Sequence, residues 1–167
     1  VPLFFFFSGF LFFHNGKFSK TLYISKLKKR SRTLLLPYVL WNAFYLLLIF
    51  IMQCLKPGFT AAIKKQVIDF GCSDWLLSFW NISIINKIPG VAMGPVVGQF
   101  WFIQDLLVLM VLSPVIWFLI RKLKAFFVTL LLAGFFSSVM PEVVGFHSVS
   151  LTYFSLGAYC SIMKCSF

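Results

Sequence analysis

The segment Leu34–Leu55 is a run of 22 residues that contains no charged side chain. At about 1.5 Å of rise per residue, a helix of that length matches the roughly 30 Å hydrocarbon thickness of a lipid bilayer. Composition agrees, because hydrophobic residues make up 60% of the chain, charged residues 11%, and Phe alone occupies 23 positions. A water-soluble domain of this length carries far more polar surface. The sequence therefore predicts an all-α, polytopic integral membrane protein.

Other apolar segments predict about five transmembrane segments that belong to a larger helix bundle. Val1–Phe13 is typical of the second half of one membrane helix, and Ser150–Met163 of the beginning of another. Phe100–Ile120 and the shorter Ala125–Met140 are predicted as further spans. Because both end segments are too short to cross a bilayer, we expect residues 1–167 to be part of a single transmembrane domain, incomplete at both ends.

The connection between the two longest spans, Lys56–Gln99, is of mixed polarity. Within it, residues 74–89 are largely apolar but fewer than the roughly 20 that a bilayer requires, so we expect an interfacial or re-entrant segment. Two prolines modify the spans themselves. Pro37 is expected in the first turn of its helix, where the missing N–H costs little, and Ser113–Pro114 predicts a kink.

The cations are distributed unevenly along the chain. Of the 15 Lys and Arg residues, eleven lie in loop 14–33, in the 121–124 turn or at Lys164, and four lie in the 56–99 connection. The positive-inside rule then places loop 14–33 in the cytoplasm, and we expect a bacterial inner (plasma) membrane. The net charge of +11 does not indicate a nucleic-acid partner, because the cations gather at the ends of apolar runs.

Five cations within seven residues immediately precede the charge-free run, namely Lys26, Lys28, Lys29, Arg30 and Arg32. One interpretation is an electrostatic anchor, in which each cation contributes about 1 kcal/mol through anionic lipid headgroups. The other is a binding site for a cytosolic ligand that bears phosphates, since Lys and Arg hold phosphate through charge-assisted hydrogen bonds. The two interpretations are compatible.

Asp105 lies five residues into the otherwise apolar span predicted from Phe100. A lone carboxylate at membrane depth costs at least about 2.5–3.5 kcal/mol, so we expect it to face protein or a watery cavity and to have a partner. Trp101, four residues earlier, shares its helix face, whereas Gln104 points elsewhere. Two roles fit this pattern: a structural hydrogen bond or ion pair between helices, and the lining of a substrate cavity.

The other candidates for chemistry are expected to have ordinary roles. His14 and His147 are predicted to be solvated loop histidines, since neither has a spaced Ser or Cys nucleophile. The four cysteines form no CxxC pair and no metal-like spacing with either histidine, so no metal site is predicted. They are expected to be small apolar side chains, with a meeting of Cys54 and Cys72 on the outer side as the alternative.

Three stretches of the chain together resemble the acyltransferase 3 family, polytopic membrane enzymes that O-acylate carbohydrates and other acceptors. VPLFFFFSGFLFF is similar to the second helix of that family. KKRSRTLLLPYVLWN is similar to its basic RxxR loop and the entry to its third helix. GQFWFIQDLLVLMVLSP is similar to its helix with the pattern WFxxDL…SP. In addition to these three stretches, FSLGAYC is similar to a later helix. The resemblance covers nearly the whole chain in order.

The resemblance implies a membrane acyltransferase. An acyl group, acetyl in the simplest case, would pass from cytosolic acyl-CoA, a co-substrate and not a cofactor, to a hydroxyl of a cell-surface carbohydrate or a similar acceptor. The RxxR pair falls on Lys29 and Arg32, with Arg30 as another source of the fork, so these three are the expected donor-binding residues. Trp101 and Asp105 are the expected cavity-lining residues.

The family's presumed catalytic His, with its partner Arg, belongs to the first helix, which would precede Val1. No catalytic residue is therefore named in this chain, and residues 1–167 are expected to be inactive alone. A transporter or flippase is the rival function, because it also shows a midplane carboxylate, although no paired broken helices are visible. A non-catalytic membrane scaffold is the third. An upstream helix with Arg and His would favour the enzyme.

Overall fold

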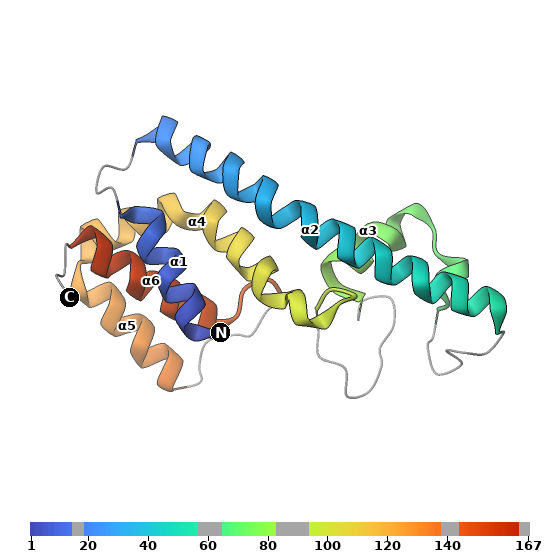
Figure 1. Cartoon of the computed structure of the whole chain (residues 1–167). Helices are drawn as coiled ribbons and strands as arrows, with labels where there is room; N and C mark the ends of the chain where they lie inside the picture. Colours follow the sequence, from blue (N-terminus) through green and yellow to red (C-terminus); the bar gives the residue numbers. More distant parts are fainter. Residues whose placement is uncertain (15–18, 57–64, 83–93, 138–143, 164–167) are drawn as a thin grey trace. The chain divides into compact units, whose positions relative to one another are not determined.

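The computed structural model describes residues 1–14, 19–56, 65–82, 94–137 and 144–163. Its elements, in order along the chain (Figure 1), are α1 (Pro2–Phe13), α2 (Lys20–Leu55), η1 (Val67–Asp69), α3 (Cys72–Asn81), η3 (Gly98–Phe100), α4 (Trp101–Leu123), α5 (Ala125–Phe136) and α6 (Ser148–Ile162). Every regular element in the described part of the chain is a helix, which confirms the all-α prediction.

The chain divides into two compact units, each of which is described by itself. One unit consists of Val1–Arg32 with Asp105–Phe167, and the other of Thr33–Gln104. The long helices α2 and α4 contribute to both units, because each of them contains a boundary. The expectation of a single transmembrane domain over residues 1–167 stays a prediction.

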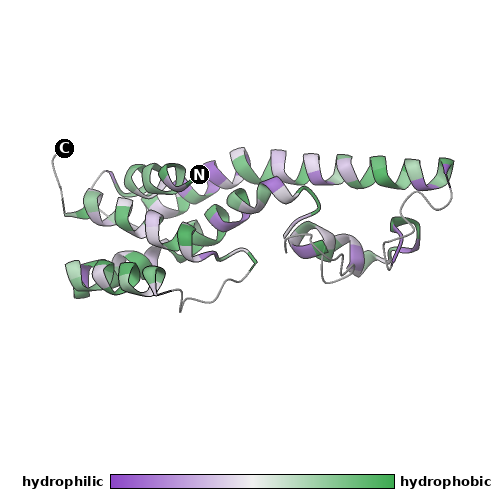
Figure 2. Ribbon diagram, turned by 90° about the horizontal axis from the view of Figure 1, so that it is seen from below, coloured by the Kyte–Doolittle hydropathy of each residue, from purple (hydrophilic) through white to green (hydrophobic). Residues whose placement is uncertain are grey.

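Two helical segments are long and apolar enough to cross a membrane, α2 and Gly98–Leu123, the latter combining η3 with α4. The helices α1 and α5 are apolar but shorter. Hydrophobic residues predominate along α1, α5 and the C-terminal half of α2 (Figure 2), and many large apolar side chains of α2 are exposed. Exposed apolar surface of this extent suits a lipid environment. The count of five spans stays a prediction.

The cations of residues 20–32 lie in a helix, so the prediction of a basic loop over 14–33 is wrong for this part of the segment. No Gly or Pro lies between Lys20 and Leu36, and Lys, Leu and Arg are good helix formers. The 36 residues of α2 span about 54 Å, about 24 Å more than the hydrocarbon thickness. The turns that contain the cations of residues 20–32, called the basic turns below, are therefore helical and extend α2 beyond its apolar part.

Two prolines lie inside long helices. Pro37 is in the interior of α2, which corrects its predicted place in a first turn, because the helix starts at Lys20. Pro114 lies within α4, which continues as one helix through the predicted kink. Proline removes the N–H that would bond the carbonyl four residues earlier, here that of Met110. The Ser113 hydroxyl donates to that carbonyl oxygen at 2.8 Å and so compensates for the loss.

In the first unit, α1 packs directly against α6 (Figure 1). A Cβ atom added to Gly9 of α1 would lie 2.2 Å from the carbonyl oxygen of Phe154. A Cβ atom added to Gly157 of α6 would lie 2.0 Å from the carbonyl oxygen of Phe6. Only residues without a side chain fit at these two positions, as in other close contacts between membrane helices.

In the second unit, polar side chains of α2 bind the connection that follows it. The residues concerned are buried in the apolar part of the helix: Tyr38, Asn42 and Gln53. The Tyr38 hydroxyl donates to the carbonyl oxygen of Phe79. Asn42 Oδ1 accepts from the Val97 N–H at 3.1 Å, and Gln53 Oε1 accepts from the Val67 N–H at 2.9 Å. Irregular backbone needs such partners wherever water is absent.

The short helix α3 begins with a cap made by Asp74. The carboxylate of Asp74 accepts hydrogen bonds from Lys65 Nζ at 2.7 Å and from the Gly71 N–H at 2.8 Å. These two bonds, the one from Lys65 first, lower the pKa of the Asp74 carboxyl below its ordinary value. With 10 residues, α3 is about 15 Å long and cannot cross a bilayer, as predicted for this segment. Residues 83–89 of the predicted interfacial or re-entrant stretch lie outside the described residues.

Replacing Gly157 with Ala is predicted to destabilise the contact between α1 and α6. The new methyl group cannot occupy the same space as the Phe6 carbonyl unless the helices move apart. We expect a loss of about 1–3 kcal/mol, the usual cost of overpacking, although Ala is the better helix former. Thermal unfolding in detergent micelles measures the loss. Gly98→Ala is the matched control, because a Cβ there has no atom within 4 Å; identical midpoints for the two variants would contradict the prediction.

Candidate functional site: a buried aspartate and the first turn of α6

Asp105 lies on α4 with its side chain completely buried. Its carboxylate contacts His147 and Ser150, which are 42 and 45 residues further along the chain. Oδ1 and Oδ2 lie 3.0 and 2.9 Å from Nδ1 of the His147 ring. Oδ2 also accepts from the His147 backbone N–H at 3.2 Å and from the Ser150 hydroxyl. The predicted need for a partner is therefore met by two neighbouring residues of one helix turn.

These contacts occur because the Asp105 side chain of α4 lies beside the first turn of α6. His147 is the N-cap residue of α6, and its extended backbone (φ −81°, ψ 144°) turns the chain into the helix. The side chain of His147 makes no capping hydrogen bond to the first turn of α6. A carboxylate is favoured at a helix N-terminus, where backbone N–H groups lack partners and the helix dipole is positive. Asp105 thus caps α6 from another helix.

Ser150 strengthens this arrangement from the third position of α6. Its Oγ lies within hydrogen-bonding distance of Asp105 Oδ2 and also 2.7 Å from the His147 carbonyl oxygen. A hydroxyl has one proton, so Ser150 donates to only one of these acceptors at a time. The carboxylate therefore has two constant donors in His147 and a third that it shares.

The ring of His147 has a defined orientation. Its Nδ1 faces both carboxylate oxygens of Asp105, so this nitrogen carries a proton. In the neutral ring, Nε2 is then the nitrogen with the lone pair. The side chain retains 22% of its accessible surface, so the ring reaches the surface of the unit.

The predicted role of His147 as a solvated loop histidine is wrong, because the ring and the backbone N–H both bind Asp105. Sequence reasoning did not identify His147 or Ser150 as partners of the carboxylate. The available signal was the segment His147–Ser150 itself, in which polar residues precede an apolar helix in the manner of an N-cap. Nothing in that segment predicts which residue of a different helix it will contact.

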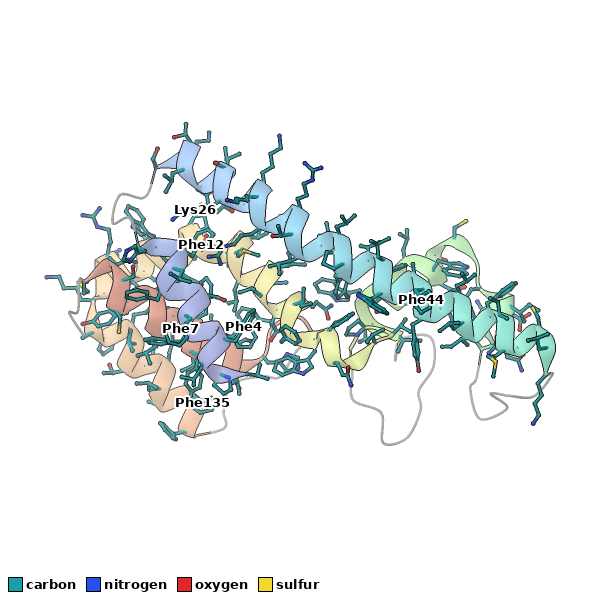
Figure 3. All side chains as sticks on the ribbon, viewed as in Figure 1. Phe4, Phe7, Phe12, Lys26, Phe44 and Phe135 are labelled. Atoms are coloured by element: carbon teal, nitrogen blue, oxygen red, sulfur yellow. The ribbon has the colours of Figure 1, made fainter. Side chains whose placement is uncertain are left out.

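The cluster of cations in α2 divides between two helix faces. Lys26 Nζ donates to the carbonyl oxygen of Phe12 and lies 5.6 Å from the centre of the Phe12 ring (Figure 3). Arg30, one turn later, also lies over that ring at 5.6 Å. In contrast, Lys29 and Arg32 are exposed. Of the three residues predicted to bind the donor, Arg30 thus faces α1 and the other two face outward.

The remaining predicted site residues, Trp101 and Asp105, lie in the first two turns of α4. Trp101 is partly exposed at the start of α4. Gln104 is buried and its Nε2 donates to the Trp80 carbonyl oxygen at 3.0 Å, so it points elsewhere than Asp105. The cavity-lining roles of Trp101 and Asp105 stay predictions. Cys54 and Cys72 are exposed and form no disulfide, and the described residues contain no group of His, Cys, Asp and Glu that could hold a metal ion.

Replacing Asp105 with Ala is predicted to loosen the start of α6, because several donors lose a buried acceptor at once. Removing one partner of a buried charged cluster costs about 3 kcal/mol, which corresponds to roughly 100-fold faster exchange of the protected amides. Hydrogen exchange of residues 147–150 measures this. Asp69→Ala is the matched control, because that carboxylate is exposed. Equal exchange rates in the two variants would show that Asp105 does not hold α6.

Comparisons with known proteins agree with the resemblance seen in the sequence. The model of the acyltransferase 3 family, described as an acyltransferase domain, matches residues 1–164. The succinoglycan biosynthesis protein ExoH of Rhizobium meliloti (strain 1021) is 26% identical over 156 residues. That match covers 93% of this chain but 38% of the relative, so the chain spans well under half of the relative's length. No solved structure matches the chain at a significant level. Because the family model matches nearly all of its residues, the chain belongs to the acyltransferase 3 family of membrane proteins.

Proposed function

We propose that the protein containing this chain is a membrane-bound acyltransferase. It transfers an acyl group, acetyl in the simplest case, from acyl-CoA to a hydroxyl of a cell-surface carbohydrate. The observation that carries this proposal is the family match over residues 1–164. The name of the relative, which refers to succinoglycan biosynthesis, supports a glycan as the acceptor. Acyl-CoA serves as co-substrate, and the reaction requires no cofactor.

The proposed orientation follows from the charges of α2 and α4. The basic turns of α2 precede its apolar part, and α4 has Arg121 and Lys122 in its last turn. The positive-inside rule assigns both of these ends to the cytoplasm, in a bacterial inner membrane. Asp105 is 16 residues before Arg121, about 24 Å along the helix axis. The cluster of Asp105 and His147 then belongs to the opposite side, where a surface glycan is presented.

The outward face of the basic turns is the proposed donor site. Lys29 and Arg32 are three residues apart, so they lie next to each other on one face of α2, and both are exposed. Charged donors in this arrangement suit the phosphates of acyl-CoA. Arg30, which lies over the Phe12 ring, is proposed to support that face from behind. Lipid headgroups bind the same cations when no donor is present.

Replacing both Lys29 and Arg32 with Gln is predicted to raise the Michaelis constant for acyl-CoA about 10-fold while kcat stays the same. The reason is that phosphate contacts made equally in the ground and transition states contribute to binding alone. Two exposed charged contacts at about 0.7 kcal/mol each amount to a factor of about 10 in affinity. Steady-state kinetics of the native protein in membranes measures the effect. Lys20→Gln is the matched control, because Lys20 is an exposed cation in the first turn of the same helix. Unchanged donor kinetics with normal membrane insertion would leave only the anchoring role.

Deleting the gene is predicted to remove one acyl mass from the repeat unit of a surface glycan. Mass spectrometry of purified glycans from the deletion strain and its parent measures the difference, and a plasmid copy of the native gene should restore the mass. A copy with both Lys29 and Arg32 replaced should restore it only in part. Glycans of identical mass in both strains would contradict the transferase and favour a transporter or a scaffold.

A further inference from the structure

We propose that Phe12 is a positioning residue for the donor site, because its ring fixes the rotation of the basic turns of α2. This inference rests on the proposed function, since it concerns how Lys29 and Arg32 come to face outward. In the proposed complex Phe12 does not touch the donor. It acts through two other cations of α2, which lie over its ring.

The ring of Phe12 joins the end of α1 to the basic turns. Its side chain is 2% exposed. Lys26 Nζ and the guanidinium carbon of Arg30 each lie 5.6 Å from the centre of the ring (Figure 3). The Tyr23 ring meets it edge-on, with the two centres 6.4 Å apart. Both cations are within the distance at which a ring face attracts a positive charge. These four side chains are called the Phe12 clamp below.

The Phe12 clamp fixes α2 about its own axis. Tyr23, Lys26 and Arg30 follow each other at spacings of three and four residues, so they share one face of the helix. Each residue of an α-helix is rotated by about 100° from the one before it, so another rotation of α2 would bring different side chains to the ring. Two hydrogen bonds hold the same face. Lys26 donates to the carbonyl oxygen of Phe12, and the Tyr23 hydroxyl donates to that of Val111 in α4 at 3.2 Å.

The outward pair lies on a different face of the same turns. Relative to Arg30, Lys29 is rotated by about 100° and Arg32 by about 160° around the helix axis. Exposure agrees, because Lys29 and Arg32 are exposed, whereas the three α2 residues of the clamp are partly buried. The rotation that the clamp holds therefore sets the direction of the pair. Basic turns that rotated freely would present the pair for part of the time only, and the apparent affinity would fall in proportion.

The clamp needs a ring at position 12, and not simply an apolar side chain. A leucine would pack against the methylene groups of Lys26 and Arg30, but it has no π face to attract their charged groups. Those groups would then turn toward water or lipid headgroups, and the basic turns would lose part of what fixes their rotation. A ring and an aliphatic side chain of similar bulk are therefore expected to differ in donor binding.

Calorimetric binding of acetyl-CoA to the native full-length protein in nanodiscs tests this role without relying on turnover. We expect Phe12→Leu to weaken binding about 3-fold, the usual effect of one cation–π contact on a population. The loss is smaller than the roughly 10-fold loss expected when Lys29 and Arg32 are both replaced, because the two cations remain. A fluorinated phenylalanine at position 12 keeps the shape of the ring but weakens its negative face, so it should behave as Phe12→Leu does. Phe12→Tyr keeps the face and should bind as the wild type does.

Phe154→Leu is the matched control. Phe154 lies on α6 and is as fully buried as Phe12, and none of the described cations lies over its ring. This variant should lower the thermal midpoint and leave the affinity for acetyl-CoA unchanged. In kinetic assays, Phe12→Leu should raise the Michaelis constant for acyl-CoA and leave kcat and the Michaelis constant for the acceptor unchanged.

If the fluorinated ring binds acetyl-CoA as tightly as the wild type does, shape alone is sufficient and the positioning role is wrong. Equal losses of affinity in Phe12→Leu and Phe154→Leu would also overturn it, as would a wild type that does not bind acetyl-CoA. Affinity that depends on the ring face, in a protein whose deletion leaves every glycan mass unchanged, would instead overturn the proposed transferase alone. The two failures are therefore distinguishable.

Discussion

The carboxylate of Asp105 must be compensated within the protein, and the position of α6 follows from that requirement. An ion completely buried in an apolar helix has no access to water, so donors have to be brought to it. The chain supplies them with the first turn of α6, through His147 and Ser150. The start of α6 determines where Gly157 lies, and Gly157 is where α1 approaches most closely. The Asp105 contacts and the two glycines thus link α4, α6 and α1 within the first unit.

The helical form of the basic turns explains how one short cluster of cations can have two roles. A loop would present all of its side chains to solvent or lipid, whereas a helix divides them by angle. Lys26 and Arg30 face Phe12 of α1, where Lys26 also bonds a carbonyl that the end of α1 leaves without a helical partner. The outward residues Lys29 and Arg32 are exposed. Attachment of α2 and the proposed contact with an anionic ligand therefore involve different side chains.

Features that depend on one continuous segment could be predicted from the sequence, whereas contacts between residues far apart in the chain could not. The charge-free run Leu34–Leu55 is visible within one segment, and it was correctly assigned to a helix. The extent of α2 was misjudged because a high density of charge was equated with a loop, although residues 20–36 contain no helix breaker. Asp105 was correctly predicted to have a partner, since the cost of burial depends on its own surroundings. The identity of the partner, 42 residues away, and the contact of Gly9 with α6 depend on which helices become neighbours, and no local pattern carries that information.

Both units contain backbone groups that lack a regular hydrogen-bond partner among apolar helices. In each unit, a backbone group without its usual partner is bonded by a side chain from a helix. Ser113 bonds the carbonyl that Pro114 leaves open, and Gln53 bonds the N–H of Val67. Such polar side chains are costly in a membrane helix unless they are paired. The proposed acyltransferase, with a donor on one side of the membrane and an acceptor on the other, needs polar groups at several depths. Side chains that bond otherwise unpaired backbone groups are polar residues of this kind, and the Asp105 carboxylate likewise has its donors within the protein.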